Sequence, residues 1–132
     1  MPNTVRPHTQ QLTHPQFDDP KKVVGWLGAV QAQNYTMAKW AVGMRLKNGN
    51  LQTVEQALQK GEILRIHVMR PTWHFVTAED IRWMLALSAK RIRATNFWLA
   101  EDQKLQVTAD HYHRCNRLFE KMLEGHKSLT KE

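Results

Sequence analysis

The sequence predicts a mainly α-helical fold with a small β-hairpin, arranged as a winged helix-turn-helix that is followed by further helices. Three short segments with helical apolar spacing and helix-start residues come first. Residues 64–76 then contain two runs of strict apolar–polar alternation, the period of half-buried strands. A hairpin with a basic tip that follows several short helices is typical of the wing of a winged helix.

Length and composition bound the organisation of the chain. Its 132 residues suit one domain, or one domain and the start of another. We expect an N-terminal arm at residues 1–17, a winged-helix unit at 18–77, and a helical extension at 78–132 that leads into a truncated second unit. No apolar run is long enough to span a membrane, and the N-terminus is not a secretory signal. The single Cys115 precludes an internal disulfide, which favours a cytoplasmic location of the bacterial type.

The charge balance points to a polyanionic partner. There are 19 Lys and Arg residues against 12 Asp and Glu residues, which gives a formal net charge of +7. Such an excess favours nucleic acid through counterion release, although many basic small proteins bind no nucleic acid. Charge alone therefore leaves DNA binding open.

Start and stop signals divide the first half of the chain into helices. Asp18-Asp19-Pro20 is a helix-start signal, because Asp is a preferred N-cap and Pro fits the first helical turn. Apolar residues at helical spacing predict that this helix runs to about Gln33. Asn34 then fits a left-handed cap, and Thr36 fits the N-cap of a second helix that ends at Asn48-Gly49.

The apolar pattern also predicts what these helices bury. The second helix shows an apolar face made of Met37, Trp40, Ala41 and Met44. A third helix, over Thr53–Lys60, opens with Thr53-x-x-Gln56, which fits a capping box. Three tryptophans fall among apolar positions and are expected in the core, namely Trp26, Trp40 and Trp83.

The alternating segment predicts which side chains share a face of the hairpin. A four-residue loop at Met69–Thr72 would place His67 opposite His74, whereas an odd-length loop would shift the register and undo that pairing. With the four-residue loop one face would be apolar and the other polar. The apolar set is Leu64, Ile66, Val68, Trp73 and Phe75, and the polar set is Arg65, His67, Thr72 and His74, with Arg70 at the tip.

Two further helices are predicted after the hairpin. Thr77-x-x-Asp80 fits a capping box for a long helix that runs toward Trp98, and Thr108 starts a last helix that ends near Gly125. The long helix is basic, and either a solvated face or contacts along a DNA backbone would explain its cations. These cations are Arg82, Lys90, Arg91 and Arg93.

Several motifs resemble a known family. They are Leu27-Gly28-Ala29-Val30-Gln31-Ala32-Gln33-Asn34-Tyr35 followed by Ala38-Lys39-Trp40-Ala41, then residues 63–74, then Glu79-Asp80-Ile81-Arg82-Trp83. In this order they are similar to the winged-helix DNA glycosylases, which include bacterial interstrand-crosslink repair enzymes and many proteins known only as winged-helix DNA-binding domain proteins. The similarity runs over nearly all of residues 6–132. Family members are normally much longer, so the chain resembles their N-terminal part, which by itself is expected to be inactive.

The resemblance implies an activity and a site. The family's signature of two glutamines around an apolar residue falls on Gln31-Ala32-Gln33, so Gln31 and Gln33 are the candidate catalytic residues. It implies hydrolysis of the N-glycosidic bond of an alkylated or crosslinked nucleobase in double-stranded DNA, without metal or cofactor. An amide can position a water and stabilise charge, but it cannot serve as a conventional general base. On a regular helix Gln31 and Gln33 could converge only if the helix ended at or just after them.

The hairpin supplies the candidate DNA-binding residues. Arg65, Arg70, Thr72 and His74 could contact phosphates or reach into a groove, or they could form a solvated sheet face on which His74 makes a core hydrogen bond. We expect no metal site. His67 and His74 lack a third ligand, and on the last helix His111 and Cys115 share a face from which His113 points away.

Two other functions stay open. The chain could be a non-catalytic winged-helix module that holds DNA or regulates it, or an interaction domain with no nucleic-acid role. The first predicts affinity that falls steeply with salt, and the second predicts no DNA binding at all. The sequence does not specify the lesion or the oligomeric state.

Overall fold

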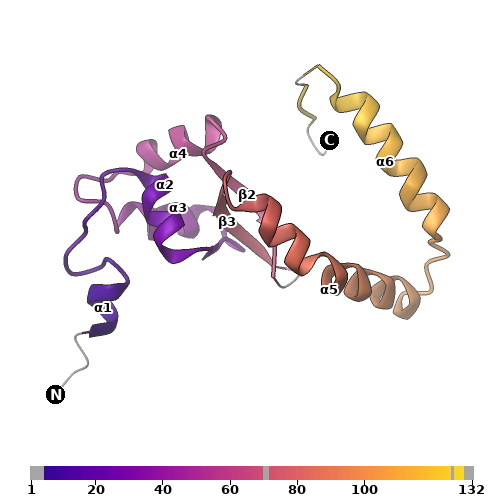
Figure 1. The fold of residues 1–132 in the computed structure, drawn as a ribbon, viewed down its shortest axis with the longest axis horizontal. Coiled ribbons are helices and arrows are strands. Elements are labelled where there is room, and N and C mark those ends of the chain that lie inside the picture. Colours follow the sequence, from indigo (N-terminus) through magenta and orange to yellow (C-terminus); the bar gives the residue numbers. More distant parts are fainter. Residues whose placement is uncertain (1–4, 70–71, 126, 130–132) are drawn as a thin grey trace. The chain divides into compact units, whose positions relative to one another are not determined.

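The structure is a computed structural model and describes residues 5–69, 72–125 and 127–129 (Figure 1). Within these ranges the protein is mainly helical with one small antiparallel sheet, as the sequence predicts. The elements, in chain order, are α1 (Val5–Thr9), α2 (Pro20–Leu27), β1 (Val30–Gln31), α3 (Tyr35–Gly43), α4 (Leu51–Gln59), β2 (Ile63–His67), β3 (Trp73–Thr77), α5 (Ile81–Asp102) and α6 (Ala109–Leu123).

Helix α2 begins where the sequence predicts but ends earlier. The Asp19 carboxylate accepts a hydrogen bond from the Lys21 N–H at 2.8 Å, and Pro20 occupies the first turn. The helix stops at Leu27 because Gly28 adopts a φ of +74°, a left-handed conformation that glycine takes without steric cost. The predicted continuation to Gln33 is therefore wrong, and the chain is free to enter β1.

Asparagines, not threonines, start α3 and α4. Asn34 has a φ of −93° and accepts a hydrogen bond from the Met37 N–H, so it is the N-cap of α3 and not a left-handed cap. Asn50 does the same for the Thr53 N–H at 2.8 Å, which moves the start of α4 ahead of the predicted Thr53. The α3 helix also ends at Gly43, before the predicted Asn48-Gly49.

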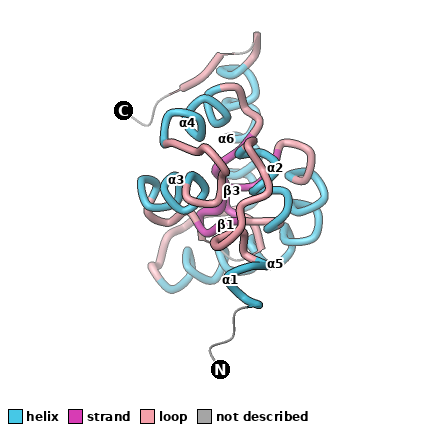
Figure 2. The backbone as a smooth tube through the Cα atoms, turned by 90° about the vertical axis from the view of Figure 1, so that its left-hand side faces the viewer, coloured by secondary structure: helices cyan, strands magenta, loops and turns pink. Residues whose placement is uncertain are grey.

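The three strands form a sheet in the order β1-β3-β2, with both pairs antiparallel. Figure 2 labels β1 and its neighbour β3 within this sheet. Strands β2 and β3 pair His67 with Trp73, so the connection covers the five residues 68–72. The predicted pairing of His67 with His74 is wrong, because an odd-length connection shifts the register by one residue.

This register distributes the apolar residues over both faces of the sheet. Phe75 and Ile63 pack on one face against α2, α3 and α4. Val76, Leu64 and Ile66 pack on the other, against the start of α5. The predicted division into one apolar and one polar face is thus wrong. The first core contains Val23, Val24, Ala32, Ala38, Val42, Leu46, Val54, Ala57, Ile63 and Phe75, and the second contains Val68, Val76 and Met84.

Three tryptophans that the sequence places in the core are largely exposed. Trp26, Trp40 and Trp83 have exposed fractions of 56%, 52% and 54%. On α3 the buried side is instead made of small residues, Ala38 and Val42, which let the helix approach the sheet closely. The predicted apolar face of α3 therefore lies mostly in solvent.

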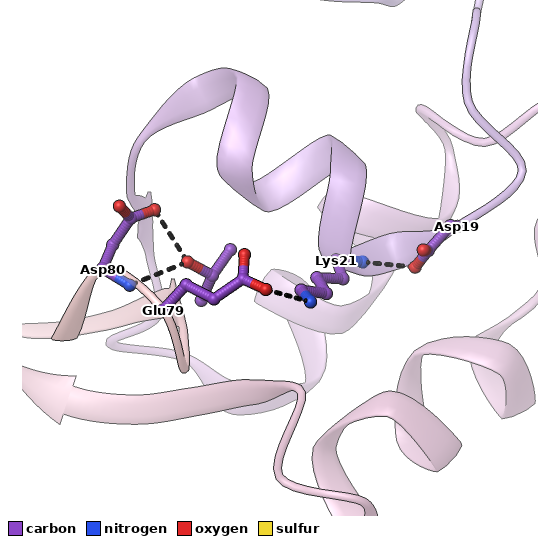
Figure 3. Close-up of polar contacts among 5 residues, drawn as sticks. Asp19, Lys21, Glu79 and Asp80 are labelled. Carbon is purple, nitrogen blue, oxygen red and sulfur yellow. Dashed lines mark hydrogen bonds and ion pairs between the residues drawn. The ribbon is translucent and has the colours of Figure 1, made fainter.

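Polar contacts tie the start of α2 to the turn between β3 and α5 (Figure 3). Lys21 Nζ lies 2.6 Å from Glu79 Oε1, and this ion pair raises the pKa of Lys21. The Thr77 hydroxyl donates to Asp80 Oδ2 at 2.7 Å and accepts from the Asp80 N–H. Only the second bond belongs to the predicted capping box, because the Asp80 carboxylate accepts from the Thr77 hydroxyl and α5 begins later, at Ile81. The indole N–H of Trp83 also donates to Asp80, so the pKa of Asp80 lies below its usual value.

The chain divides into two compact units with the boundary between Ala94 and Thr95. In the second unit the Phe97 and Tyr112 rings meet edge to face at 5.4 Å. Thr108 is the N-cap of α6 as predicted, and His111 completes its capping box. No described helix is long and apolar enough to cross a lipid bilayer.

Candidate active site

The strand β1 positions the two candidate glutamines. After the left-handed Gly28, the chain extends and pairs with β3, so that Val30 lies opposite Phe75 and Gln31 opposite His74. The Ala32 N–H donates to the Trp73 carbonyl at 2.7 Å, which continues the pairing by one residue. The glutamines therefore do not lie on a helix.

Both glutamine side chains are exposed, on either side of a buried alanine. Ala32 is fully buried in the core formed with α2, α3 and α4, whereas Gln31 and Gln33 are exposed. Helix α2 ends at Leu27, before both glutamines, so the predicted helix end at or just after them is wrong. Gln31 lies in β1 and Gln33 in the bend that follows it, and their convergence on one substrate stays a prediction.

The Gln33 amide is held at the end of β3. Its Oε1 accepts a hydrogen bond from the Trp73 N–H at 3.3 Å. Its Nε2 has no hydrogen-bond partner among the described residues, and it is free to donate outward. An amide in this arrangement presents a donor, since its acceptor is already engaged.

Arg65 reaches the backbone of the same segment from β2. Its Nε donates to the Ala32 carbonyl at 3.0 Å and its Nη2 to the Gln33 carbonyl at 3.3 Å. The guanidinium also lies over the rings of Trp73, at 4.5 Å, and Tyr35, at 5.4 Å. The DNA contact expected of Arg65 stays a prediction, while its observed partners are main-chain carbonyls and aromatic rings.

The other predicted DNA-binding residues lie around the connection between β2 and β3. His74 is buried, and its Nδ1–H donates to the Thr72 carbonyl at 2.9 Å. The Thr72 hydroxyl is buried and has no partner within the described part of the chain. Arg70 lies outside the described residues. Because His74 pairs with Gln31, the two side chains share one face of the sheet.

The sequence of this chain matches a known protein family over most of its length. The family model described as DNA glycosylase AlkZ-like matches residues 24–132, which is most of the chain. The chain belongs to the AlkZ-like DNA glycosylase family. The expected resemblance to the winged-helix DNA glycosylases is confirmed at this level.

A solved structure shows the same fold as this AlkZ-like chain. The DNA glycosylase AlkZ of Streptomyces sahachiroi is similar to it, with a TM-score of 0.72 and 23% sequence identity. The similarity covers 91% of this chain and 32% of that one, so the chain spans about a third of the length of that protein. No curated protein sequence matches the chain.

Sequence reasoning missed a group of interacting residues on α3 and α4 of this AlkZ-like chain, which meets the candidate site through Arg65, because the Arg65 guanidinium lies over the Tyr35 ring. The Tyr35 ring packs edge-on against Phe75, and Lys39 Nζ lies over the Tyr35 ring, 4.7 Å from its centroid. Lys39 in turn pairs with Glu55 of α4 at 2.5 Å. Their positions in the sequence could have indicated this group. Tyr35 directly follows the Gln33-Asn34 pair, and Lys39 lies one helical turn later on the same face of α3.

The two predicted histidines do not face each other, and the cations of α5 lie in solvent. His67 and His74 point to opposite faces of the sheet, because His67 pairs with Trp73 and His74 with Ile66. Among the residues that the structure describes, no group of three or more His, Cys, Asp or Glu side chains could hold a metal ion. The four cations predicted on α5 are all exposed, namely Arg82, Lys90, Arg91 and Arg93.

Proposed function

We propose that this chain is the DNA-binding, winged-helix portion of a DNA glycosylase that hydrolyses the N-glycosidic bond of alkylated or crosslinked nucleobases in double-stranded DNA. The observation that carries the proposal is the pair of exposed glutamine side chains at β1 and directly after it, in a chain of the AlkZ-like DNA glycosylase family. We place this activity in the bacterial cytoplasm, in line with the single cysteine.

The order of elements supports a winged helix. Helix α2, strand β1, helices α3 and α4, and the hairpin β2–β3 follow one another, with β3 between β1 and β2 in the sheet. In this arrangement α3 and α4 form the helix-turn-helix, α4 is the candidate recognition helix, and the hairpin is the wing. The wing carries Arg65, Thr72 and His74, and Arg70 belongs to its connection.

The chemistry suits amide groups. In the hydrolysis, the bond between C1′ and the base nitrogen breaks and its electron pair leaves with the base. A water oxygen forms the new bond to C1′ and releases one proton. A cationic alkylated base leaves as a neutral group, so it needs no protonation, and the developing positive charge on the sugar can be stabilised by oriented dipoles. Within the pair, Gln31 would position the water and stabilise this charge through its amide oxygen, and Gln33 would help to position the reacting groups through its outward Nε2 donor.

The test is release of alkylated bases from methylated duplex DNA by a full-length protein that contains this chain, and by its variants, because this chain alone is expected to be inactive. Gln31→Ala and Gln33→Ala should each reduce release by about 100-fold, while DNA affinity stays within about threefold. The matched control is Gln103→Ala, which removes an exposed glutamine from the second unit. Unchanged release in both active-site variants would overturn the catalytic assignment.

A non-catalytic DNA-binding module is the second candidate, favoured by the net charge of +7 and by the chain's span of about a third of the matching glycosylase. It predicts salt-dependent DNA binding with no base release even by the full-length protein. The same assay, run with a salt titration of the affinity, therefore decides between the two candidates.

A further inference from the structure

The pairing between β1 and β3 ends in an unusual way at Ala32 and Trp73. In an antiparallel hydrogen-bonded pair, each residue donates its N–H to the carbonyl of the other. Here the first bond is present, from the Ala32 N–H to the Trp73 carbonyl. The second bond of such a pair would run from the Trp73 N–H to the Ala32 carbonyl. Here the Trp73 N–H donates to the Gln33 side chain instead, and the Ala32 carbonyl accepts from Arg65.

This replacement fixes which end of the Gln33 amide faces outward. A backbone N–H can only donate, so the amide group that meets Trp73 must be its oxygen. The nitrogen end is then left without a partner among the described residues, on an exposed side chain. Rotation of the amide by 180° would bring two donors together and lose the bond.

Arg65 holds the backbone that carries this amide. It bonds two consecutive carbonyls, Ala32 and Gln33, directly before the N-cap residue of α3. Its guanidinium lies over Trp73, the residue whose N–H orients Gln33. A planar fork with several donors can make these contacts at once, whereas a lysine ammonium cannot bridge them with the same geometry.

Resting on the proposed function, we propose that Gln33 acts as a hydrogen-bond donor through Nε2 toward an acceptor oxygen of the damaged nucleotide, and that Arg65 is the positioning residue that fixes this orientation. Arg65 then acts through Gln33 and not through a phosphate. Gln31, whose side chain has no partner within the described part of the chain, is the glutamine free to accept as well as donate.

The orientation is tested by amide hydrogen exchange at Trp73, measured by NMR. The Trp73 N–H should exchange slowly in the unmodified protein and in Gln33→Glu, whose carboxylate can still accept. It should exchange at least about tenfold faster in Gln33→Ala and in Arg65→Lys. Asn50→Ala, which weakens the start of α4, controls for a general loss of stability. Exchange that does not change in Gln33→Ala would overturn the assigned orientation.

The donor role is tested by the affinity for duplex DNA with a tetrahydrofuran abasic-site analogue, compared with an undamaged duplex. Gln33→Glu should lose the preference for the analogue by about tenfold, whereas Gln103→Glu, with the same added charge in the second unit, should keep it. Arg65→Lys should lose the preference as Gln33→Ala does. Full affinity in Arg65→Lys, with unchanged exchange at Trp73, would assign Arg65 to phosphate contact and overturn its positioning role.

The two tests separate this inference from the proposed function. If the unmodified protein binds both duplexes equally or neither, the glycosylase proposal and the donor role toward DNA fail together. The exchange measurement still decides the orientation of Gln33, because it needs no DNA. If the preference exists but Gln33→Glu retains it, the donor role alone fails.

Discussion

The two units of this protein use apolar side chains in opposite ways. In the unit that ends at Ala94, Phe75 is fully buried between α2, α3 and α4, while in the unit that begins at Thr95, Phe119 of α6 is 55% exposed. No described residue of the second unit is buried. Helix α6, which lies wholly in that unit, has helical apolar spacing, so an amphipathic pattern predicts a helix but not a core. The sheet supplies the surface that makes the difference in the first unit.

The largest effect that follows from this comparison concerns the two phenylalanines. Phe75→Ala should lower the free energy of unfolding by about 3–5 kcal/mol, because it removes a buried ring and leaves a cavity. Phe119→Ala should change it by less than about 0.5 kcal/mol, because its ring already contacts water. Urea denaturation followed by circular dichroism measures both. A similar loss in both variants would contradict the contrast between the units.

A pair of left-handed glycines sharpens the comparison. Gly28 and Gly125 follow α2 and α6 with φ values of +74° and +77°. A side chain at either position costs about 1–2 kcal/mol locally. Gly28→Ala should lower the urea midpoint, since it lies between α2 and β1, which both contribute to the core. Gly125→Ala should only fray the end of α6 and leave the urea midpoint unchanged. An equal fall of the midpoint in both variants would contradict the burial pattern, because it would mean that α6 contributes to global stability as much as α2 does.

The N-caps of α3 and α6 should show the same contrast between the two units, with a smaller change in stability. Asn34→Ala removes the acceptor for the Met37 N–H and should cost about 1 kcal/mol of global stability. Thr108→Ala removes the N-cap of α6 and should reduce helicity without moving the main transition. Circular dichroism before and through the transition separates the two responses. A shifted transition for Thr108→Ala would be the contrary result.

Asp80 gives the smallest expected effect, visible as a pH dependence. Hydrogen bonds from Trp83 and Thr77 lower its pKa in the folded protein. A carboxyl with a lowered folded pKa contributes stability above its unfolded pKa of about 4, and that contribution is lost as the pH falls through the folded value. The urea midpoint should therefore fall below about pH 4 by more in the unmodified protein than in Asp80→Asn. An identical pH dependence of the urea midpoint in the two proteins would show that Asp80 does not contribute to stability in this way.

The sequence predicted the starts of elements better than their ends and pairings. Asp19-Pro20 and Thr108 were identified because capping is local chemistry. The strand β1 was missed because apolar spacing continued through Gly28, although Val30-Gln31-Ala32-Gln33 alternates like a strand. The hairpin register depended on whether the connection has four or five residues, and no residue in it decides that from sequence alone.

The candidate site shows the same limit. The glutamine pair could be found as a motif, but its geometry arises from long-range contacts. Arg65, for example, bonds the carbonyls of Ala32 and Gln33, which lie more than thirty residues earlier in the chain. The exposed tryptophans were missed for a related reason, since small residues such as Ala38 occupy the buried side of α3. Burial depends on which face meets the sheet, and helical spacing alone did not identify that face.

One measurement tests the central claim most directly, that the exposed glutamine side of β1 meets damaged DNA. It is an NMR titration of the isotope-labelled protein with a duplex that contains one N7-methylguanine, read at the side-chain amides of all glutamines. The account predicts shift changes at Gln31 and Gln33 that exceed those with undamaged duplex, with Gln103 unaffected. Changes confined to other glutamines, or equal for both duplexes, would contradict it.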